Sequence, residues 1–330
     1  MLEKIFVLGA NSFAGSQFIA SALEAGYSVV GINRSAEPSD IFLPYRELLA
    51  KPDYEFHQLD INRDFSALCD LLDETKPEFI VDFAGQGMVA ESWQDPLQWY
   101  QTNFISKVKL HEFLRQQTWL QRYVRISTPE VYGSSESLIE ENNHYLPSTP
   151  YAVSHAAIDM SLRTYFNQYN FPIIFTRYSN FYGPGQQLYR IIPRTIIYAL
   201  TGQKLQLHGG GKAIRAFIYG ADVGSAVLAT LRKGVIGESY HFSASEFVSI
   251  KALVEMICDK MHIQFDDFVE MVPDRPGKDL RYLMDDSKAK QQLAWQPETT
   301  LSSGIDATIE WVSKNLEEIK KLPLNYIHKD

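Results

Sequence analysis

Residues 125–157 contain side chains that can move protons. A short apolar run there ends in hydroxyls, including that of Thr128, and in the carboxylate of Glu130. Further along, Tyr151 and His155 stand four residues apart, so on a helix they share one face. A phenol, a hydroxyl, a carboxylate and an imidazole are the groups from which general acid and base catalysis is built. These residues are therefore our candidate catalytic set.

The elements around this set place it at the edge of a sheet. Residues 123–126 predict a buried strand, and the segment that starts at Tyr151 predicts a helix. In a parallel sheet, the residues that follow a strand border the crevice where ligands bind. Strand end and helix start are therefore expected to meet at one cleft.

The N-terminal segment predicts a second feature of the same edge. Residues 4–8 (KIFVL) form an apolar strand, GANSFAG follows, and a helical pattern runs from Ser16 to Glu24. Glycines at both ends of that turn permit a tight bend and close helix packing, and the helix N-terminus offers N–H groups to a pyrophosphate. An ordinary turn is the alternative. The candidate cofactor residues here are Gly9, Asn11, Ser12, Phe13 and Gly15, with Ser12 where a middle glycine would stand.

The second predicted strand, residues 28–32, ends in Asn33 and Arg34. An acid at this point would bind a ribose 2′-hydroxyl, whereas a neutral residue followed by arginine suits a 2′-phosphate in charge and in bidentate geometry. The sequence therefore predicts NADP, with NAD as the alternative. Arg34 could instead be a solvated loop charge.

Composition excludes several classes of partner. The 330 residues carry a net charge of −9 without a basic run, which argues against nucleic acid and membrane surfaces. The two cysteines form no metal-type pair, so no metal is expected, and reduced thiols suggest the cytoplasm. The first apolar run is too brief for a signal peptide, and no stretch approaches the ~20 apolar residues of a membrane span.

Several segments resemble one family. RISTPEVYG and YAVSH resemble the S-T-D-E-V-Y-G and Y-x-x-x-K segments of the extended short-chain dehydrogenase/reductases, most closely the nucleotide-sugar 4,6-dehydratases that act on dTDP-glucose or GDP-mannose. Pro129 replaces the acid and His155 the lysine of these segments. The resemblance implies an α/β fold, a doubly wound parallel sheet (Rossmann) with a smaller C-terminal substrate domain. It assigns residues 1–180 and 215–243 to the nucleotide domain and 181–214 and 244–330 to the substrate domain.

The resemblance also implies ligand contacts. Implied cofactor contacts are Asp60, Ile61, Ala84, Gly85, Gln86 and Asn103, together with Tyr151 and His155. Asp60 has turn formation as its alternative role. Implied substrate contacts are Met88, which replaces a family histidine, Ser92, Asn180, Arg190, Arg215, Lys278 and Arg281. The guanidinium groups of Arg190 and Arg215 suit a diphosphate, although each could be a surface charge.

In the reaction that the resemblance implies, Tyr151 takes the proton of the sugar C4 hydroxyl and Thr128 hydrogen-bonds the reacting oxygen. Glu130 takes the C5 proton, and because Pro129 cannot donate, the same carboxyl then acts as the acid toward the C6 hydroxyl. An NDP-sugar 4-epimerase or 4-keto reductase would need only Tyr151 and Thr128. A non-catalytic nucleotide-sugar binder is the third alternative, because His155 replaces the lysine.

Two further expectations concern assembly. The predicted helix from Tyr151 to Tyr169 is apolar on two stripes. One stripe would face the sheet, and the other predicts a homodimer in which this helix and the preceding one, residues 97–117, pair across a two-fold axis. A single large core is the alternative. The charged segment after Glu317 predicts a docked or frayed helix end.

Overall fold

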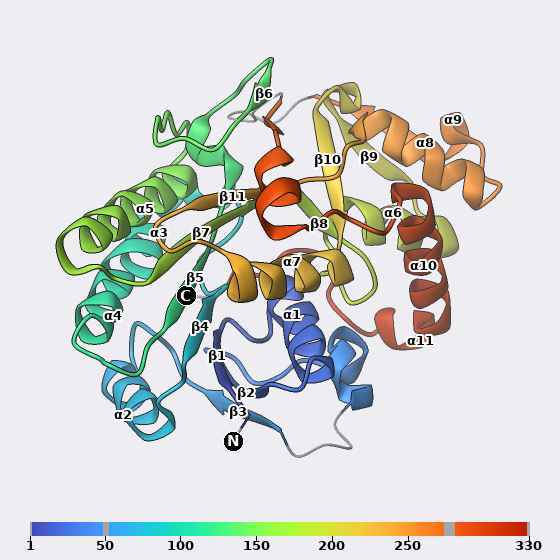
Figure 1. Cartoon of the computed structure of the whole chain (residues 1–330). Coiled ribbons are helices and arrows are strands. Elements are labelled where there is room, and N and C mark those ends of the chain that lie inside the picture. The colour runs from blue at the N-terminus through green and yellow to red at the C-terminus, as the bar shows by residue number, and fades with distance from the viewer. Residues whose placement is uncertain (1, 49–52, 274–280, 329–330) are drawn as a thin grey trace.

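The computed structural model describes residues 2–48, 53–273 and 281–328 and contains one large parallel sheet. Its seven strands lie in the order β11, β7, β5, β4, β1, β2, β3 (Figure 1). Short runs of apolar residues, buried on both faces, form the central strands, as is usual in parallel sheets. The predicted doubly wound fold is confirmed. The strands are β1 (Lys4–Leu8), β2 (Ser28–Asn33), β3 (Tyr54–Gln58), β4 (Phe79–Asp82), β5 (Arg122–Ser127), β7 (Ile173–Tyr178) and β11 (Ser239–Phe242).

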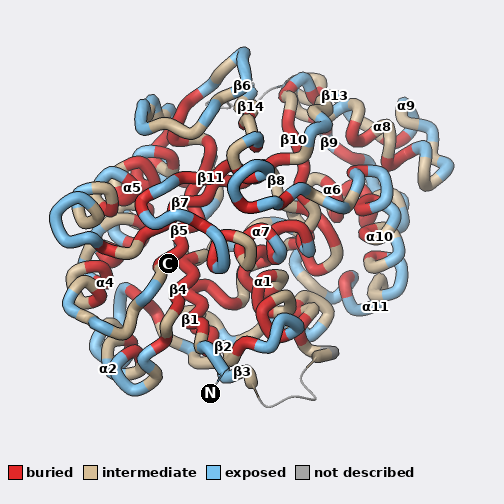
Figure 2. Tube along the Cα trace, in the orientation of Figure 1, coloured by how far each residue is buried: buried red, intermediate tan, exposed pale blue. Residues whose placement is uncertain are grey.

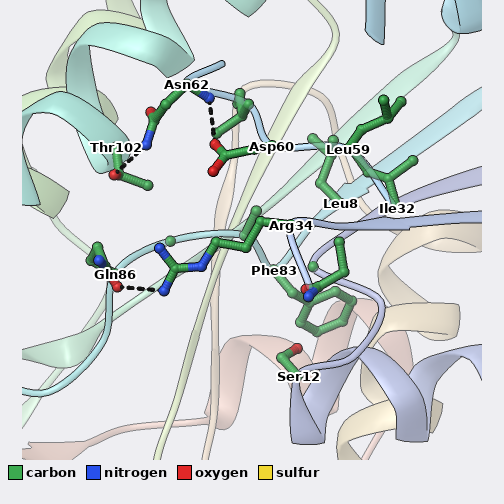
Figure 3. Close-up of a pocket in the computed structure, with 15 residues that line it drawn as sticks. Leu8, Ser12, Ile32, Arg34, Leu59, Asp60, Asn62, Phe83, Gln86 and Thr102 are labelled. Atoms are coloured by element: carbon green, nitrogen blue, oxygen red, sulfur yellow. Dashed lines mark hydrogen bonds between the residues drawn. The ribbon is translucent and has the colours of Figure 1, made fainter. Parts of the chain in front are cut away.

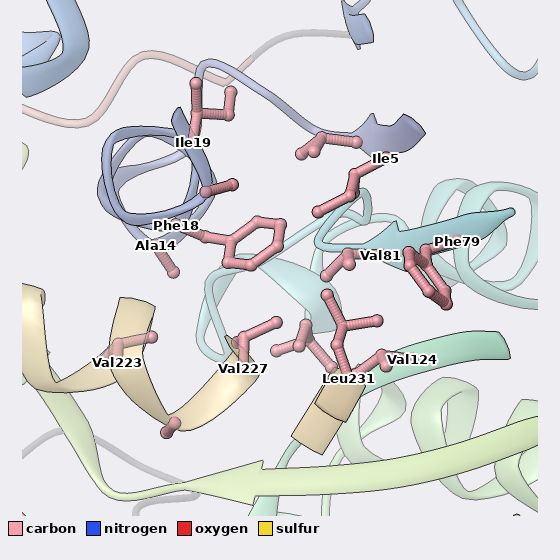
Figure 4. Packing of buried hydrophobic residues seen from close by; sticks show 14 of the residues in the cluster. Ile5, Ala14, Phe18, Ile19, Phe79, Val81, Val124, Val223, Val227 and Leu231 are labelled. Atoms are coloured by element: carbon pink, nitrogen blue, oxygen red, sulfur yellow. The ribbon is translucent and has the colours of Figure 1, made fainter. Parts of the chain in front are cut away.

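Helices cover both faces of this sheet. On one face, α1 (Phe13–Glu24) and α7 (Gly220–Lys233) bury Phe18, Val227 and their neighbours against alternate strand residues such as Val81 (Figure 4). On the other face, α2 (Phe65–Thr75), α4 (Ser106–Leu114) and α5 (Pro150–Tyr169) pack over the intervening strand residues. The red interior of Figure 2 shows this layering. Such packing holds the strand ends at fixed positions.

A smaller part of the chain lies beyond the carboxyl ends of the strands. It contains a sheet ordered β12, β10, β8 and two pairs, β13 with β9 and β14 with β6. The predicted domain boundary at residue 215 falls inside β10, which pairs with β8 and β12 rather than with the large sheet. The elements are β6 (Leu138–Ile139), β8 (Asn180–Tyr182), β9 (Leu205–His208), β10 (Ile214–Tyr219), β12 (Phe247–Ser249), β13 (Val269–Val272), β14 (Leu283–Met284), α6 (Ile191–Leu200), α8 (Ile250–Lys260), α9 (Phe265–Phe268), α10 (Leu301–Lys314) and α11 (Leu316–Ile319).

The predicted helix over residues 97–117 is interrupted. It consists of α3 (Pro96–Tyr100), a π-helical turn at Gln101–Ile105 and α4. Single π turns inside helices often occur at functional sites. Here the turn contains Asn103. The remaining short helices are Asp40–Phe42, Pro44–Leu48, Glu91–Trp93, Pro129–Tyr132, Gly209–Gly211 and the π turn Ala289–Leu293.

The segment after α11 is docked, which was one of the two predicted alternatives, but it is not helical. The helix ends at Ile319, and residues 320–328 run back toward α3. Arg194 Nη2 donates to the carbonyl oxygen of Leu324 over 3.1 Å, and the Tyr326 ring packs edge-on against Tyr189. His328 then stacks on Trp99 of α3, with ring centroids 5.3 Å apart. The last described residue, His328, therefore lies against α3, where its Nε2 also hydrogen-bonds the Gln98 side chain over 2.5 Å.

Among the described residues, we find no helix with the length and apolar character that a membrane span requires.

Candidate active site

The structure brings the end of β5 and the start of α5 together. Thr128 caps a short 3-10 helix, Pro129–Tyr132, and its Oγ1 accepts a hydrogen bond from the Glu130 N–H over 3.3 Å. Helix α5 begins with Pro150 at its first turn, and Thr149 caps it through the Ala152 N–H. Tyr151 is therefore held at the helix start, where its side chain hydrogen-bonds Thr128.

The surroundings of Tyr151 oppose ionisation. Burial raises the pKa of the phenol above its usual value, and the nearby Glu130 carboxylate raises it further. The Thr128 hydrogen bond and the Arg190 guanidinium act in the opposite direction. The site therefore combines a protonated phenol with a carboxylate, as a proton-transfer pair requires.

His155 lies one turn along α5, with its ring centroid 4.6 Å from that of Tyr151. Arg125 Nη2 donates to its Nδ1 over 3.0 Å. Burial, and then the charge of Arg125, hold the pKa of His155 well below its usual value, so the imidazole is neutral. The sequence prediction missed Arg125, although an arginine inside an otherwise apolar strand was the signal that could have identified it.

Arg125 belongs to a buried group of charges beneath the site. Lys107 pairs with Asp82, and Arg177 Nη2 lies 2.7 Å from Asp159 Oδ2. Arg125 lies 3.7 Å from an oxygen of each of these carboxylates. All five side chains are almost completely buried. The group contains three cations and two carboxylates.

The glycine turn after β1 forms a cradle that fits a dinucleotide. Gly9 has a φ of +80°, and a Cβ there would lie 2.8 Å from the Ala84 nitrogen. A Cβ on Gly15 would lie 2.4 Å from the Gly9 carbonyl oxygen. Both positions therefore require glycine. Ser12 caps α1 by accepting from the Gly15 N–H over 3.0 Å, so the helix begins at Phe13 rather than at Ser16.

A pocket opens between this turn and the ends of β2 and β4 (Figure 3). The Arg34 side chain extends into it between Asp60 and Phe83, and its Nη2 donates to Gln86 Oε1 over 3.2 Å. Asn11 Nδ2 donates to the Ser35 carbonyl and so ties the glycine turn to the loop after β2. The pocket is lined by Leu8, Gly9, Ser12, Ile32, Asn33, Arg34, Leu59, Asp60, Ile61, Asn62, Phe83, Ala84, Gly85, Gln86 and Thr102.

Two polar residues shape this pocket in different ways. Asp60 accepts a hydrogen bond from the Asn62 N–H over 2.8 Å and another from the Arg63 side chain, so it stabilises a turn, the alternative role given for it above. It also lines the pocket. Asn103 exchanges two hydrogen bonds with the backbone of Gln86 and donates to Ser154 Oγ over 3.0 Å. It thereby joins the loop after β4 to α5.

The predicted substrate residues before α5 lie close to Tyr151. Ser92 is buried, and its Oγ accepts from the Tyr151 N–H over 3.2 Å. Met88 adopts a φ of +68°, a left-handed conformation that non-glycine residues rarely occupy. Strained backbone of this kind is often found where a chain contacts a ligand.

The later predicted substrate residues are distributed over the smaller part of the chain. Arg215 is buried and lies over the ring of Tyr282, 4.2 Å from its centroid, and Tyr282 donates to Asn180 Oδ1 over 3.0 Å. Arg190 lies on the surface at the start of α6, and the Arg281 carbonyl accepts from Ser134 and Ser135. Lys278 lies outside the described residues.

No group of three or more histidine, cysteine, aspartate or glutamate side chains within the described ranges has a metal-binding arrangement.

The fold and the site define an extended short-chain dehydrogenase/reductase. A parallel sheet, a glycine cradle and a tyrosine at the start of α5 occur together at one edge. The family model described as GDP-mannose 4,6 dehydratase matches residues 6–308, and the chain belongs to that family.

Relatives and solved structures agree with this assignment. The dTDP-glucose 4,6-dehydratase of Xanthomonas campestris pv. campestris (strain B100) is 31% identical over 328 residues, 94% of this chain and 93% of the relative. The Escherichia coli dTDP-glucose 4,6-dehydratase is 32% identical over 345 residues, 95% and 94% of the two chains. The structure of the Bacillus anthracis dTDP-glucose 4,6-dehydratase with NAD has a TM-score of 0.86 at 30% identity and covers 97% of this chain and 100% of that one.

Proposed function

We propose that this chain is a nucleotide-sugar 4,6-dehydratase that converts an NDP-hexose to an NDP-4-keto-6-deoxyhexose. The observation that carries the proposal is the position of Glu130, whose carboxylate lies near enough to Tyr151 to raise the pKa of the phenol. A redox exchange at C4 needs the phenol alone, whereas elimination of water across C5 and C6 also needs a base. Glu130 provides that base.

The chain's own groups account for the proton transfers. Tyr151, as phenolate, takes the proton of the C4 hydroxyl, and Thr128 holds the oxygen in place. A bound nicotinamide would accept the hydride from C4 and return it to C6 after water has left, while C5 takes back a proton, so the cofactor is unchanged after one turnover. Glu130 then takes the C5 proton and delivers a proton to the C6 hydroxyl, which leaves as water. Pro129 has no group that could do this, so one carboxyl serves as base and then as acid.

A panel of sugar nucleotides tests this function. We expect one member among dTDP-, UDP-, GDP- and CDP-hexoses to lose the mass of one water on incubation with the protein and cofactor. The names of the relatives place dTDP-glucose first in that panel. An unchanged mass for every sugar nucleotide in the panel would contradict the proposal.

A second candidate is an NDP-sugar 4-epimerase or 4-keto reductase. The Bacillus cereus UDP-glucuronic acid 4-epimerase, solved with UDP-glucuronic acid and NAD, has a TM-score of 0.86 at 26% identity. Inversion at C4 without loss of mass would identify an epimerase, and a C4 alcohol formed from a ketone would identify a reductase. A ligand that binds without turnover would indicate a non-catalytic binder.

For the cofactor we propose NADP rather than the NAD bound in the related structures. Arg34 extends into the pocket at the end of β2. Proteins that bind NAD usually have an acid near this position, which would repel a 2′-phosphate, whereas an arginine attracts it. A charge-assisted contact of this kind contributes ~1.5–3 kcal/mol. We expect NADP to bind at least about tenfold more tightly than NAD, and Arg34→Ala to remove the difference. Calorimetric titrations that give equal affinities for the parent protein would contradict this.

We propose a homodimer formed by α3, the π turn and α5. Leu97 and Ile105 are 74% and 43% exposed, and on α5 Val153 and Met160 are 38% and 59% exposed. These apolar groups repeat at helical spacing on neighbouring helices, as a buried interface requires. Light scattering should give twice the chain mass of 37.7 kDa for the parent and one chain mass for Met160→Glu. A monomeric parent would contradict the proposal.

The cytoplasmic location also remains a proposal. Cys69 and Cys258 are free, and burial raises the pKa of each thiol to about 11. Inert, reduced thiols suit a reducing compartment. Cell fractionation followed by immunodetection would test this.

A further inference from the structure

We infer that Arg125 is a positioning residue that fixes His155 as an Nε2–H donor, so that the two together take the part of the lysine in the Y-x-x-x-K segment. The role of this donor in turnover rests on the proposed function. The contact between the Arg125 and His155 side chains, and the tautomer that follows from it, are independent of that function.

The tautomer follows from the hydrogen bond. A guanidinium group has only donors, so the Nδ1 atom that Arg125 Nη2 contacts at 3.0 Å must accept. A neutral imidazole carries one proton, which must then lie on Nε2. Nε2 has no partner among the described residues and is not one of their fully buried atoms without a partner, so it retains some exposed surface. His155 therefore presents a donor beside Tyr151.

The charge of Arg125 is available to His155 because neither carboxylate binds Arg125 closely. Asp82 forms an ion pair with Lys107. Asp159 forms an ion pair with Arg177 and accepts a hydrogen bond from the Ser127 hydroxyl over 2.6 Å. The contact of Arg125 with His155 is shorter than its 3.7 Å distances to the two carboxylates. One positive charge in the buried group is thus in excess, and it lies against the imidazole. A polarised N–H is a stronger donor.

Other groups around the pair do not reverse this assignment. Lys107 and Arg177 act on His155 in the same direction as Arg125. Tyr123, which donates to Asp82, is neutral because burial holds the pKa of its phenol well above the usual value. His111 is neutral because burial lowers the pKa of its imidazole to about 3. Around Tyr151 itself, Glu130 and Tyr282 raise the pKa, while Thr128 and Arg190 lower it.

The first test observes the imidazole directly and needs no substrate. Protein labelled with 15N-histidine is analysed by long-range 15N–1H correlation, and the signals missing in His155→Gln identify His155. We expect the parent to show the Nε2–H tautomer without protonation down to mildly acidic pH. Arg125→Met should give a mixture of tautomers or a pKa closer to the usual value, and Arg125→Lys, which keeps charge and donor, should retain the Nε2–H form.

Arg163→Met is the matched control, because this arginine lies on α5 with His155 but donates to the Gly237 carbonyl. It should leave the His155 signals unchanged. An Nδ1–H tautomer in the parent, or a His155 spectrum that Arg125→Met does not alter, would overturn the inference. Arg125→Met should fold, because each carboxylate keeps its closer cation. If it does not, Arg125→Lys and the parent still decide the tautomer.

The second test uses turnover. Loss of the group that orients a metal-bound histidine typically costs roughly 10- to 100-fold. We expect a fall of the same order in kcat/KM for Arg125→Met near neutral pH, with a smaller deficit at alkaline pH. Arg125→Met combined with His155→Lys should recover most of it, since one cation again stands beside Tyr151. A double variant no better than Arg125→Met would overturn the inference. A parent inactive on every sugar nucleotide would instead refute the proposed function, and the tautomer would still decide the inference.

Discussion

Tyr151 must lose its proton before it can accept one from a sugar hydroxyl, and its surroundings oppose that loss. Burial and Glu130 raise its pKa, and neutral His155 offers a donor rather than a full cation. The phenolate fraction therefore grows as pH rises toward the raised pKa. We expect log kcat/KM to climb through the neutral range into the alkaline range. A rate that is already flat below neutral pH would show that another group governs ionisation.

Glu130 separates elimination from simpler redox chemistry. Glu130→Gln keeps size and hydrogen bonding but removes the base, so turnover should fall ~10²–10⁴-fold while cofactor binding is retained. With the preferred sugar nucleotide, the variant should accumulate the absorbance of reduced nicotinamide and fail to exchange the C5 proton for solvent deuterium. Normal deuterium uptake at C5 would remove Glu130 from the mechanism.

At this scale the sequence identified several residues that the structure places close together, and their roles remain predictions. Thr128, Glu130 and Tyr151 follow a strand and open a helix in a recognisable order, and the structure brings them together. It did not reveal the contact of Arg125 with His155, because that partner stands 30 residues later and its position depends on how α5 crosses the sheet. Linear spacing contains no such information.

The π turn between α3 and α4 shows how an element can serve the site. Asn103 stands in this turn and reaches both the loop after β4 and Ser154 on α5. We expect Asn103→Ala to lower the free energy of unfolding by ~1–3 kcal/mol, because the buried Gln86 backbone and Ser154 each lose a partner. It should also weaken cofactor binding.

Gln101→Ala, in the same turn but exposed, is the control. Denaturant unfolding and cofactor titration of both variants would separate the two effects. Equal affinity for the cofactor in Asn103→Ala and in the parent would mean that the loop after β4 holds its shape without this link.

Elements were predicted better than their ends. The strands follow from apolar runs, but α1 begins earlier than expected because the Ser12 side chain caps it. The π turn was missed because residue propensities do not encode tertiary contacts such as those that Asn103 makes in this turn.

Over the whole molecule, the C-terminal segment joins the two parts of the chain. It is held by Arg194 and Tyr189 on one side and by Trp99 on the other. Removal of the residues after Leu322 should lower the free energy of unfolding by ~0.5–1.5 kcal/mol for each ring pair lost. It should also weaken sugar-nucleotide binding, because Tyr189 precedes Arg190. Calorimetric titration measures this, and an unchanged affinity would limit the segment to a stabilising role.

The stacking of His328 on Trp99 gives the protein a built-in optical reporter. The indole is almost completely buried, and its Nε1 donates to the Gly87 carbonyl over 3.0 Å, in the loop beside the cofactor pocket. The emission of this indole is measured as the difference between the parent and Trp99→Phe. It should change when the segment lifts away, because Trp99 then loses the stacked ring of His328. Detachment could then be followed in real time, without any attached dye, as the cofactor and the sugar nucleotide enter.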